Sequence, residues 1–286
     1  MTAGKLNPHR SFKGLCTPLR NLNRYARGVM SNLENFVGRV AGKLGLTVSR
    51  TSSLSERLPI EATARDRSII EQVRPFTMTS SERIWSLLRA VDYLHANEIV
   101  GDFVECGVWR GGSVMAMALR LQQLGATDRK LWLYDTFQGM TPPTDRDVEA
   151  VGGVSADALL KNTAVGNGNN VWCMADLPDV QMNLAKTSYP EQLVNFVEGD
   201  VSQTLLEKSP DSISLLRLDT DWYDSTQREL EVLYPKLVPG GVCILDDYGH
   251  WLGARAAVDE YFSGQAVKPL MLPIDFSGRI FIKPGI

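Results

Sequence analysis

Two pairs of aspartates follow apolar runs in the second half of the chain. Asp219 and Asp221 end the run at 213–221, and Asp246 and Asp247 end the run at 242–247. If both runs are parallel strands, their carboxyl ends meet at one edge of a sheet and bring four carboxylates together. Like charges at such short range are unfavourable unless a cation neutralises them, and oxygen ligands without His or Cys favour Mg²⁺ or Mn²⁺. Helix capping explains any one of these acids but explains all four poorly.

A glycine-rich turn at 101–112 is the second group of residues with chemical potential. An apolar run leads into the glycines, and apolar residues at helical spacing follow at 113–124. Such a strand, turn and helix place a nucleotide-like ligand over the helix N-terminus. Trp109 stands where a dinucleotide-binding turn needs its second glycine, which argues against an NAD-dependent dehydrogenase. Glu105 suits a ligand with cationic or hydroxyl groups, and S-adenosylmethionine carries both.

The elements that position these residues alternate along the chain. Apolar patterns predict further strands and helices, namely strands at 130–137, 194–201, 213–221 and 242–247, helices at 63–73, 225–237 and 252–263, and a closing hairpin at 269–274 and 278–283. Thr79 and Glu82 have the spacing of a capping box for another helix that ends near Asn97. This alternation predicts an α/β fold with a mostly parallel sheet whose last strand is antiparallel. Asp135, at the end of the second strand, is placed to accept hydrogen bonds from ribose hydroxyls or to cap a helix.

The chain divides by charge into a basic leader and an acidic body. Residues 1–50 contain nine Lys or Arg and one acid, in a chain whose net charge is −3. Apolar residues at helical spacing from 19 to 44 predict a basic amphipathic helix, and a Ser-rich linker follows, so we assign 1–60 to a helical extension and 61–286 to the main domain. Packing on its own body, packing on a second subunit and contact with a membrane surface all stay open for this helix. Few aromatics interleave with the charges, which argues against nucleic acid.

Length and composition allow one large domain or two small ones with a full core. The 286 residues are 44% apolar and include no run long enough to span a membrane. Four scattered cysteines show no zinc-binding spacing and are typical of a reducing compartment, so we expect a cytoplasmic protein. Residues 138–190 have the least regular pattern and are rich in glycine and proline. We expect this segment to be a loop or lid that sets substrate specificity.

Four segments of the chain resemble the macrocin O-methyltransferase family, which includes the tylosin, mycinamicin and novobiocin sugar O-methyltransferases. The matching motifs lie at 101–112, 133–140, 218–223 and 245–249. The resemblance runs from about 78 to 283, is loose between 144 and 191, and leaves out the basic leader.

The resemblance implies a Rossmann-like class I methyltransferase fold, with a mostly parallel seven-stranded sheet, helices on both faces and an N-terminal helical extension. It implies S-adenosylmethionine as methyl donor, Mg²⁺ as a bound ion, a small glycoside or saccharide as acceptor, antibiotic biosynthesis as the setting and a homo-oligomer as the assembly. Its site residues fall on Asp221 as general base, on Asp219, Asp246 and Asp247 as metal ligands, and on Met78, Thr79, Ser80, Glu105, Gly107, Ser113, Asp135 and Asp200 as cofactor-binding residues.

This mechanism agrees with the chemistry of the residues. A sugar hydroxyl is weakly acidic, so a cation that stabilises the developing alkoxide and a carboxylate that removes the proton both promote its methylation. His250 is a second candidate for the base, although a supporting role suits it better. Two other functions stay open, namely O-methylation of a catechol-like phenol, and a non-catalytic cofactor-binding or scaffold protein. Intact acids at all four strand-end positions argue against the scaffold.

Overall fold

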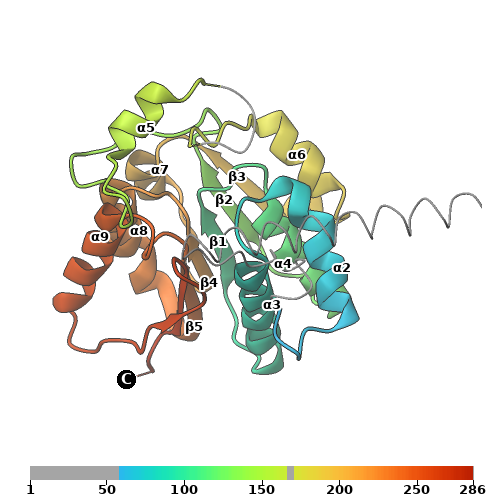
Figure 1. Cartoon of the computed structure of the whole chain (residues 1–286). Helices are drawn as coiled ribbons and strands as arrows, with labels where there is room; N and C mark the ends of the chain where they lie inside the picture. Colours follow the sequence, from blue (N-terminus) through green and yellow to red (C-terminus); the bar gives the residue numbers. More distant parts are fainter. Residues whose placement is uncertain (1–57, 166–170, 286) are drawn as a thin grey trace, which may run out of the picture. The chain divides into compact units, whose positions relative to one another are not determined.

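The computed structural model describes residues 58–165 and 171–285, and within them seven strands form one sheet (Figure 1). The order is β3-β2-β1-β4-β5-β7-β6. The strands are β1 (Asp102–Cys106), β2 (Leu131–Asp135), β3 (Val194–Glu198), β4 (Ile213–Leu218), β5 (Leu237–Leu245), β6 (Leu272–Pro273) and β7 (Arg279–Ile282). The first five are parallel to one another, and β7 pairs antiparallel with β5 and with β6. The predicted mostly parallel sheet with an antiparallel last strand is confirmed.

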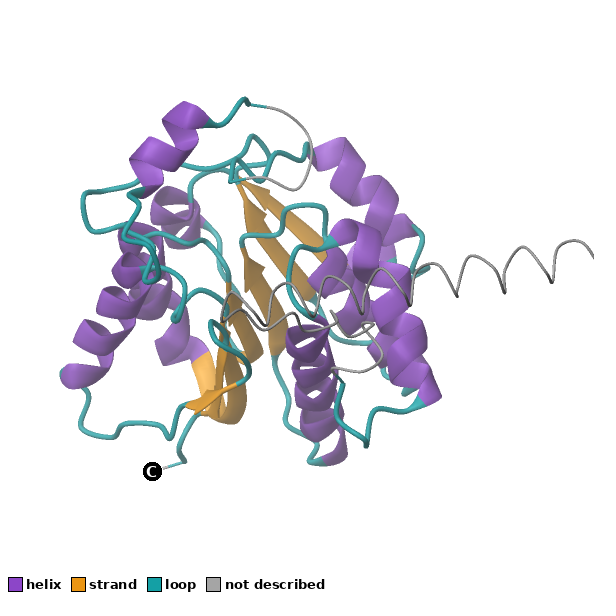
Figure 2. Ribbon diagram, viewed as in Figure 1, coloured by secondary structure: helices purple, strands orange, loops and turns teal. Residues whose placement is uncertain are grey.

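Helices cover both faces of the sheet, as Figure 2 shows. One face packs against α2 (Ala64–Val73), α3 (Ser81–Ala96), α4 (Gly112–Gln123) and α6 (Leu177–Ala185). The other packs against α7 (Val201–Glu207), α8 (Tyr223–Leu233) and α9 (Leu252–Ser263). Successive strand residues point to opposite faces, so Phe103 belongs to the first core and Val104 to the second. All six residues of β4 are buried, as expected for a central strand covered on both faces.

The sheet order creates the crevice in which the site lies. The chain moves outward from β1 to β2 and β3, then returns to β4 on the other side of β1. Ligands bind where such a reversal leaves a gap at the carboxyl ends of the strands. The glycine turn after β1 and the acids after β4 and β5 all lie at this edge.

Several predicted boundaries need correction, and the strands expected at 194–201 and 213–221 end earlier, at Glu198 and Leu218. Ser80, and not Thr79, caps α3, because its side chain accepts from the Arg83 backbone while the Thr79 hydroxyl donates to Asp246. The helix expected at 225–237 begins at Tyr223 and ends at Leu233, and a single 3₁₀ turn follows because Pro235 lacks the N–H that would continue it. β5 begins at Leu237, ahead of the predicted start at 242, because it continues through the Pro-Gly-Gly sequence.

The segment at 138–190 contains more structure than its composition indicated. It includes α5 (Ala156–Asn162) and α6, and isolated bridges join Val148 to Ser155 and Glu149 to Trp251. The completely buried Asp147 accepts from the Thr144 backbone and from the Tyr223 backbone at the start of α8. These contacts fasten the described part of the segment to α8 and α9.

The basic helix and most of the linker predicted in 1–60 lie outside the described residues. No helix in the two described ranges is long and apolar enough to cross a membrane.

Candidate active site

The glycine turn after β1 forms one wall of a pocket at the carboxyl edge of the sheet. Gly107 has a φ of +80°, and a Cβ there would lie 1.8 Å from the Asp219 carbonyl oxygen. Only glycine therefore lets the ends of β1 and β4 approach this closely. Asp135 braces the turn, because its Oδ2 accepts from the Val108 backbone at 2.7 Å and from the Trp109 backbone at 3.0 Å.

Asp135 does not cap a helix, because a turn follows it and its Oδ1 accepts from the Phe137 backbone at 2.8 Å. The helix-cap alternative is therefore wrong. Its position on the pocket wall is compatible with the ribose role, which stays a prediction.

The pocket brings together almost all of the residues selected from the sequence. Eleven of the twelve line it, namely Met78, Thr79, Glu105, Gly107, Ser113, Asp135, Asp200, Asp219, Asp221, Asp246 and Asp247. Ser80 is the exception. Its hydroxyl donates to Asp275 at 2.9 Å and accepts from the Arg83 backbone at the start of α3.

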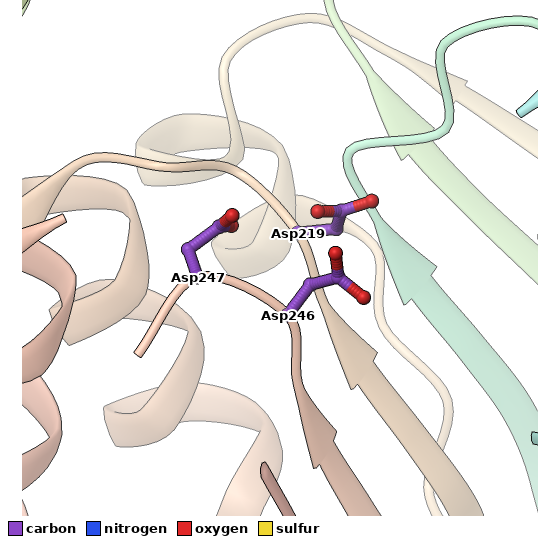
Figure 3. A group of neighbouring side chains, drawn as sticks. All are labelled: Asp219, Asp246 and Asp247. Carbon is purple, nitrogen blue, oxygen red and sulfur yellow. The ribbon is translucent and has the colours of Figure 1, made fainter. Parts of the chain in front are cut away.

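Three carboxylates form a compact group at the ends of β4 and β5. Asp219, Asp246 and Asp247 each offer an oxygen within 4.8 Å of the others, and Figure 3 shows their side chains converging. The Asp221 backbone donates to Asp247 Oδ2 at 3.2 Å. The parallel pairing of β4 and β5 places the two strand ends side by side, as the sequence predicted.

Two arginines, the buried Arg217 and the half-buried Arg83, share this negative charge, and sequence analysis missed both. Arg217 on β4 forms ion pairs with Glu105, with Asp219 at 2.7 Å and with Asp246 at 2.6 Å. Arg83 on α3 forms ion pairs with Asp246 and with Asp275. For Arg217 the available signal was its position as the single charged residue in the strand before Asp219, since a charge in a buried strand needs a partner.

Burial and charge set the protonation of the group. Burial, followed by the charge of Asp219, raises the pKa of Asp221 to about 7. Burial also raises the pKa of Glu105 to about 7, although Arg217 opposes the effect. For Asp246 burial acts in the same direction, but Arg217 and Arg83 overcome it and hold its pKa below the ordinary value.

The group has the donor chemistry for a hard divalent cation. All three oxygen donors are carboxylates. Among the described residues, seven carboxyl groups line the pocket (Glu105, Asp135, Asp200, Asp219, Asp221, Asp246 and Asp247), but only one arginine, Arg83, does so. Asp247 forms no ion pair with another described residue, whereas Asp246 would share its oxygens with Arg217, Arg83 and Thr79. The residues therefore fit Mg²⁺, with Asp247 as the least encumbered ligand.

The residues predicted for the cofactor line the same pocket, except Ser80. Glu105 is buried, and its Oε2 atom has no hydrogen-bond partner among the described residues. Asp200 follows β3 and caps α7, accepting from the Ser202 backbone at 2.8 Å. Ser113 is buried in the first turn of α4, and Met78 lies at the pocket rim with 41% of its surface exposed.

His250 also lines the pocket but stands apart from the carboxylate group. Its Nε2 lies 3.9 Å from Glu149 Oε1, and its ring meets those of Trp251 and Phe276 edge-on. Burial lowers the pKa of His250.

Comparison with known proteins identifies the family of the chain. The family model for macrocin O-methyltransferases matches residues 46–283, which begins upstream of the resemblance seen in the sequence. The chain is 31% identical over 223 residues to demethyldecarbamoylnovobiocin O-methyltransferase of Streptomyces niveus, covering 75% of this chain and 81% of the relative. It is 33% identical over 202 residues to a Streptomyces olivaceus enzyme, 8-demethyl-8-(2,3-dimethoxy-alpha-L-rhamnosyl)-tetracenomycin-C 4′-O-methyltransferase, covering 71% and 73%.

Solved structures show the same fold. The O-methyltransferase NovP superposes with a TM-score of 0.63 at 30% identity, over 73% of this chain and 83% of NovP. The calicheamicin methyltransferase CalS11 has a TM-score of 0.51 at 17% identity, over 82% of this chain and 98% of CalS11, which supports the fold alone. The chain therefore belongs to the macrocin O-methyltransferase family and is an S-adenosylmethionine-dependent O-methyltransferase.

Proposed function

We propose that the enzyme methylates a sugar hydroxyl of a glycosylated natural product or other saccharide, and that the transfer depends on Mg²⁺. One observation carries the proposal, namely a single pocket that combines the acids expected to bind the cofactor with a trio of converging carboxylates. The relative named for a rhamnosyl-tetracenomycin supports this class of acceptor. Together with the relative named for a novobiocin precursor, it supports a role in antibiotic biosynthesis.

Glu105 is the central cofactor residue in this proposal. A buried carboxylate oxygen without a donor costs about 1–3 kcal/mol, and Glu105 Oε2 is in that position. A hydroxyl or ammonium group of S-adenosylmethionine would satisfy it. Asp135 and Asp200 would bind the ribose and the adenine region, while Gly107, Ser113, Met78 and Thr79 complete the surface.

Asp219, Asp246 and Asp247 would hold the metal ion. An ion held by these three carboxylates would supply stabilisation of negative charge on an acceptor hydroxyl oxygen. Arg217 and Arg83 keep Asp246 ionised, so this residue is ready to act as a ligand.

Asp221 would remove the proton of the acceptor hydroxyl. A base with a pKa of about 7 suits proton transfer near neutral pH. The new carbon–oxygen bond forms as the methyl carbon–sulfur bond breaks, so the pocket must hold the oxygen, carbon and sulfur in line. The products are the methyl ether and neutral S-adenosylhomocysteine, and the proton goes to Asp221.

The test measures S-adenosylhomocysteine release across deoxysugar glycosides, simple saccharides and catechols, with Mg²⁺ and with a chelator. We expect turnover on a glycoside that the chelator abolishes. Turnover on catechols alone would favour the phenol methyltransferase instead, and turnover that persists in the chelator would exclude the metal requirement. Binding of S-adenosylhomocysteine without turnover on any compound would favour the non-catalytic protein.

We also propose a homo-oligomer with a cytoplasmic location. Light scattering and cell fractionation measure these two properties. The role of residues 1–60, including contact with a membrane, is a separate question for the same experiments on a truncated chain.

A further inference from the structure

A buried tryptophan outside the pocket contacts the proposed base. The indole Nε1 of Trp251, at the start of α9, donates a hydrogen bond to Asp221 Oδ1 at 2.7 Å. Asp221 lines the pocket, whereas Trp251 is only 3% exposed and lies behind it. Because Asp221 Oδ1 accepts this hydrogen bond, the other carboxylate oxygen, Oδ2, is the one that would receive the proton of the acceptor.

The backbone of Asp221 gives this contact its importance. Asp221 has a φ of +67°, in the left-handed region that non-glycine residues seldom adopt, and its N–H is held by Asp247 Oδ2. The backbone fixes where the side chain starts, but the carboxylate can still rotate about its own bonds. A general base needs a defined direction toward the proton it removes, and the Trp251 hydrogen bond supplies that restraint.

Trp251 is itself held by several independent contacts. Its backbone N–H donates to the Asp247 carbonyl at 3.0 Å, and an isolated bridge joins it to Glu149. Its ring meets Trp222 edge-on at 4.9 Å between centroids. Both rings belong to a small core, the tryptophan cluster, made of Ala156, Leu160, Trp222, Trp251 and Ala254. A side chain restrained in this way can orient another without loss of much additional entropy.

We propose that Trp251 is a positioning residue, whose indole N–H fixes one oxygen of the Asp221 carboxylate so that the other faces the acceptor hydroxyl. This inference rests on the proposed function, in which Asp221 is the base. The tryptophan cluster also includes Ala156 and Leu160 from the segment at 141–160. This segment would therefore help to position the base, in addition to the substrate specificity predicted for it. The orientation of the base then depends on how this segment packs.

The matched pair of variants is Trp251→Phe and Trp222→Phe. Both remove one buried indole from the same cluster, but Trp222 Nε1 donates to the Thr141 carbonyl and not to a carboxylate. We expect Trp251→Phe to lower kcat by about tenfold or more, because misdirection of a catalytic group is costly, while S-adenosylhomocysteine affinity is unchanged. Trp222→Phe should lose a similar amount of thermal stability with a much smaller fall in kcat. Equal falls in kcat would reduce Trp251 to a packing residue.

A double-mutant cycle with Asp221→Asn separates positioning from packing. If Trp251 acts through Asp221, Trp251→Phe should cost no further kcat once the base is gone. The same fold-loss in both backgrounds would overturn the proposal. Normal turnover by the Asp221→Asn variant would refute the assignment of Asp221 as the base in the proposed function. If Asp221→Asn is inactive but Trp251→Phe is fully active, only the positioning role of Trp251 is refuted.

An NMR experiment tests the contact without any turnover. In ¹⁵N-tryptophan-labelled protein, the indole signal that disappears in Trp251→Phe belongs to Trp251. We expect its proton to move upfield in Asp221→Asn, since a neutral amide is a weaker acceptor than a carboxylate. An unchanged signal would show that the hydrogen bond does not exist in solution.

Discussion

Glu229→Gln should stabilise the protein relative to the unmodified chain, and this difference in the free energy of unfolding should grow as the pH rises. Glu229 lies on α8 with its carboxyl group completely buried, and the Thr220 hydroxyl, between Asp219 and Asp221, donates to its Oε1 at 2.9 Å. Burial raises the pKa of Glu229 from 4.5 to about 8. The folded protein therefore keeps this carboxyl group protonated at neutral pH.

The sign of the effect follows from proton binding. Between pH 4.5 and about 8 the folded state holds this proton and the unfolded state does not. The free energy of unfolding then falls as pH rises, by about 1.4 kcal/mol per pH unit. Between pH 4.5 and about 8 the free energy of unfolding therefore falls by about a few kcal/mol at most. Glutamine is neutral at every pH and keeps an oxygen that can accept from Thr220, so the variant escapes this loss.

Urea denaturation at pH 5, 7 and 8.5 measures the difference between Glu229→Gln and the unmodified protein. We expect the difference to be near zero at pH 5 and to grow to a few kcal/mol at pH 8.5. Glu231→Gln is the control, because it removes the same charge from an exposed carboxyl on the same helix. A difference that does not change with pH would show that Glu229 is ionised in the folded protein, and would refute the argument from burial.

Three further predictions concern the site itself. Asp221→Asn should lower kcat by about 10²–10⁴-fold in the S-adenosylhomocysteine release assay. The fold should stay intact, because asparagine tolerates the positive φ of this position. A loss of kcat below tenfold would exclude Asp221 as the base. Asp247→Asn should weaken Mg²⁺ binding in calorimetry with little change in Tm. Asp246→Asn should also lower Tm, because it removes the charged partner of the buried Arg217 and the half-buried Arg83, and loss of one partner of a buried ion pair costs about 3–5 kcal/mol. Equal Tm values for the two variants would contradict this. Gly107→Ala should lower Tm far more than Gly125→Ala. Both glycines have a positive φ, but only a Cβ at Gly107 would clash with a neighbouring atom, the Asp219 carbonyl oxygen. Similar losses of Tm would refute the close approach of β1 and β4.

The sequence was informative wherever neighbouring residues decide the structure. The helix at 252–263 was predicted with its observed bounds, because the spacing of its apolar residues is a local property. The strand-turn-helix around Gly107 and the acids after β4 and β5 were located for the same reason. Local patterns failed at boundaries that depend on packing, such as the early start of β5 at Leu237.

Contacts between distant residues were decided by the tertiary structure alone. From the sequence we predicted that four carboxylates lie together and that a cation neutralises them. The sequence did not show that Arg217 and Arg83 already neutralise part of this negative charge. Nor did it show that Asp135 braces the glycine turn or that Trp251 holds Asp221.

The sequence by itself determined the α/β class, the order of the elements and the sheet edge that carries the chemistry, because periodicity and strand ends are encoded residue by residue. The tertiary structure decided which charges pair, which carboxylate oxygens stay available and which tryptophan orients the base. These features depend on the direction of side chains from elements far apart in the chain, and only packing of the two cores around the sheet fixes those directions.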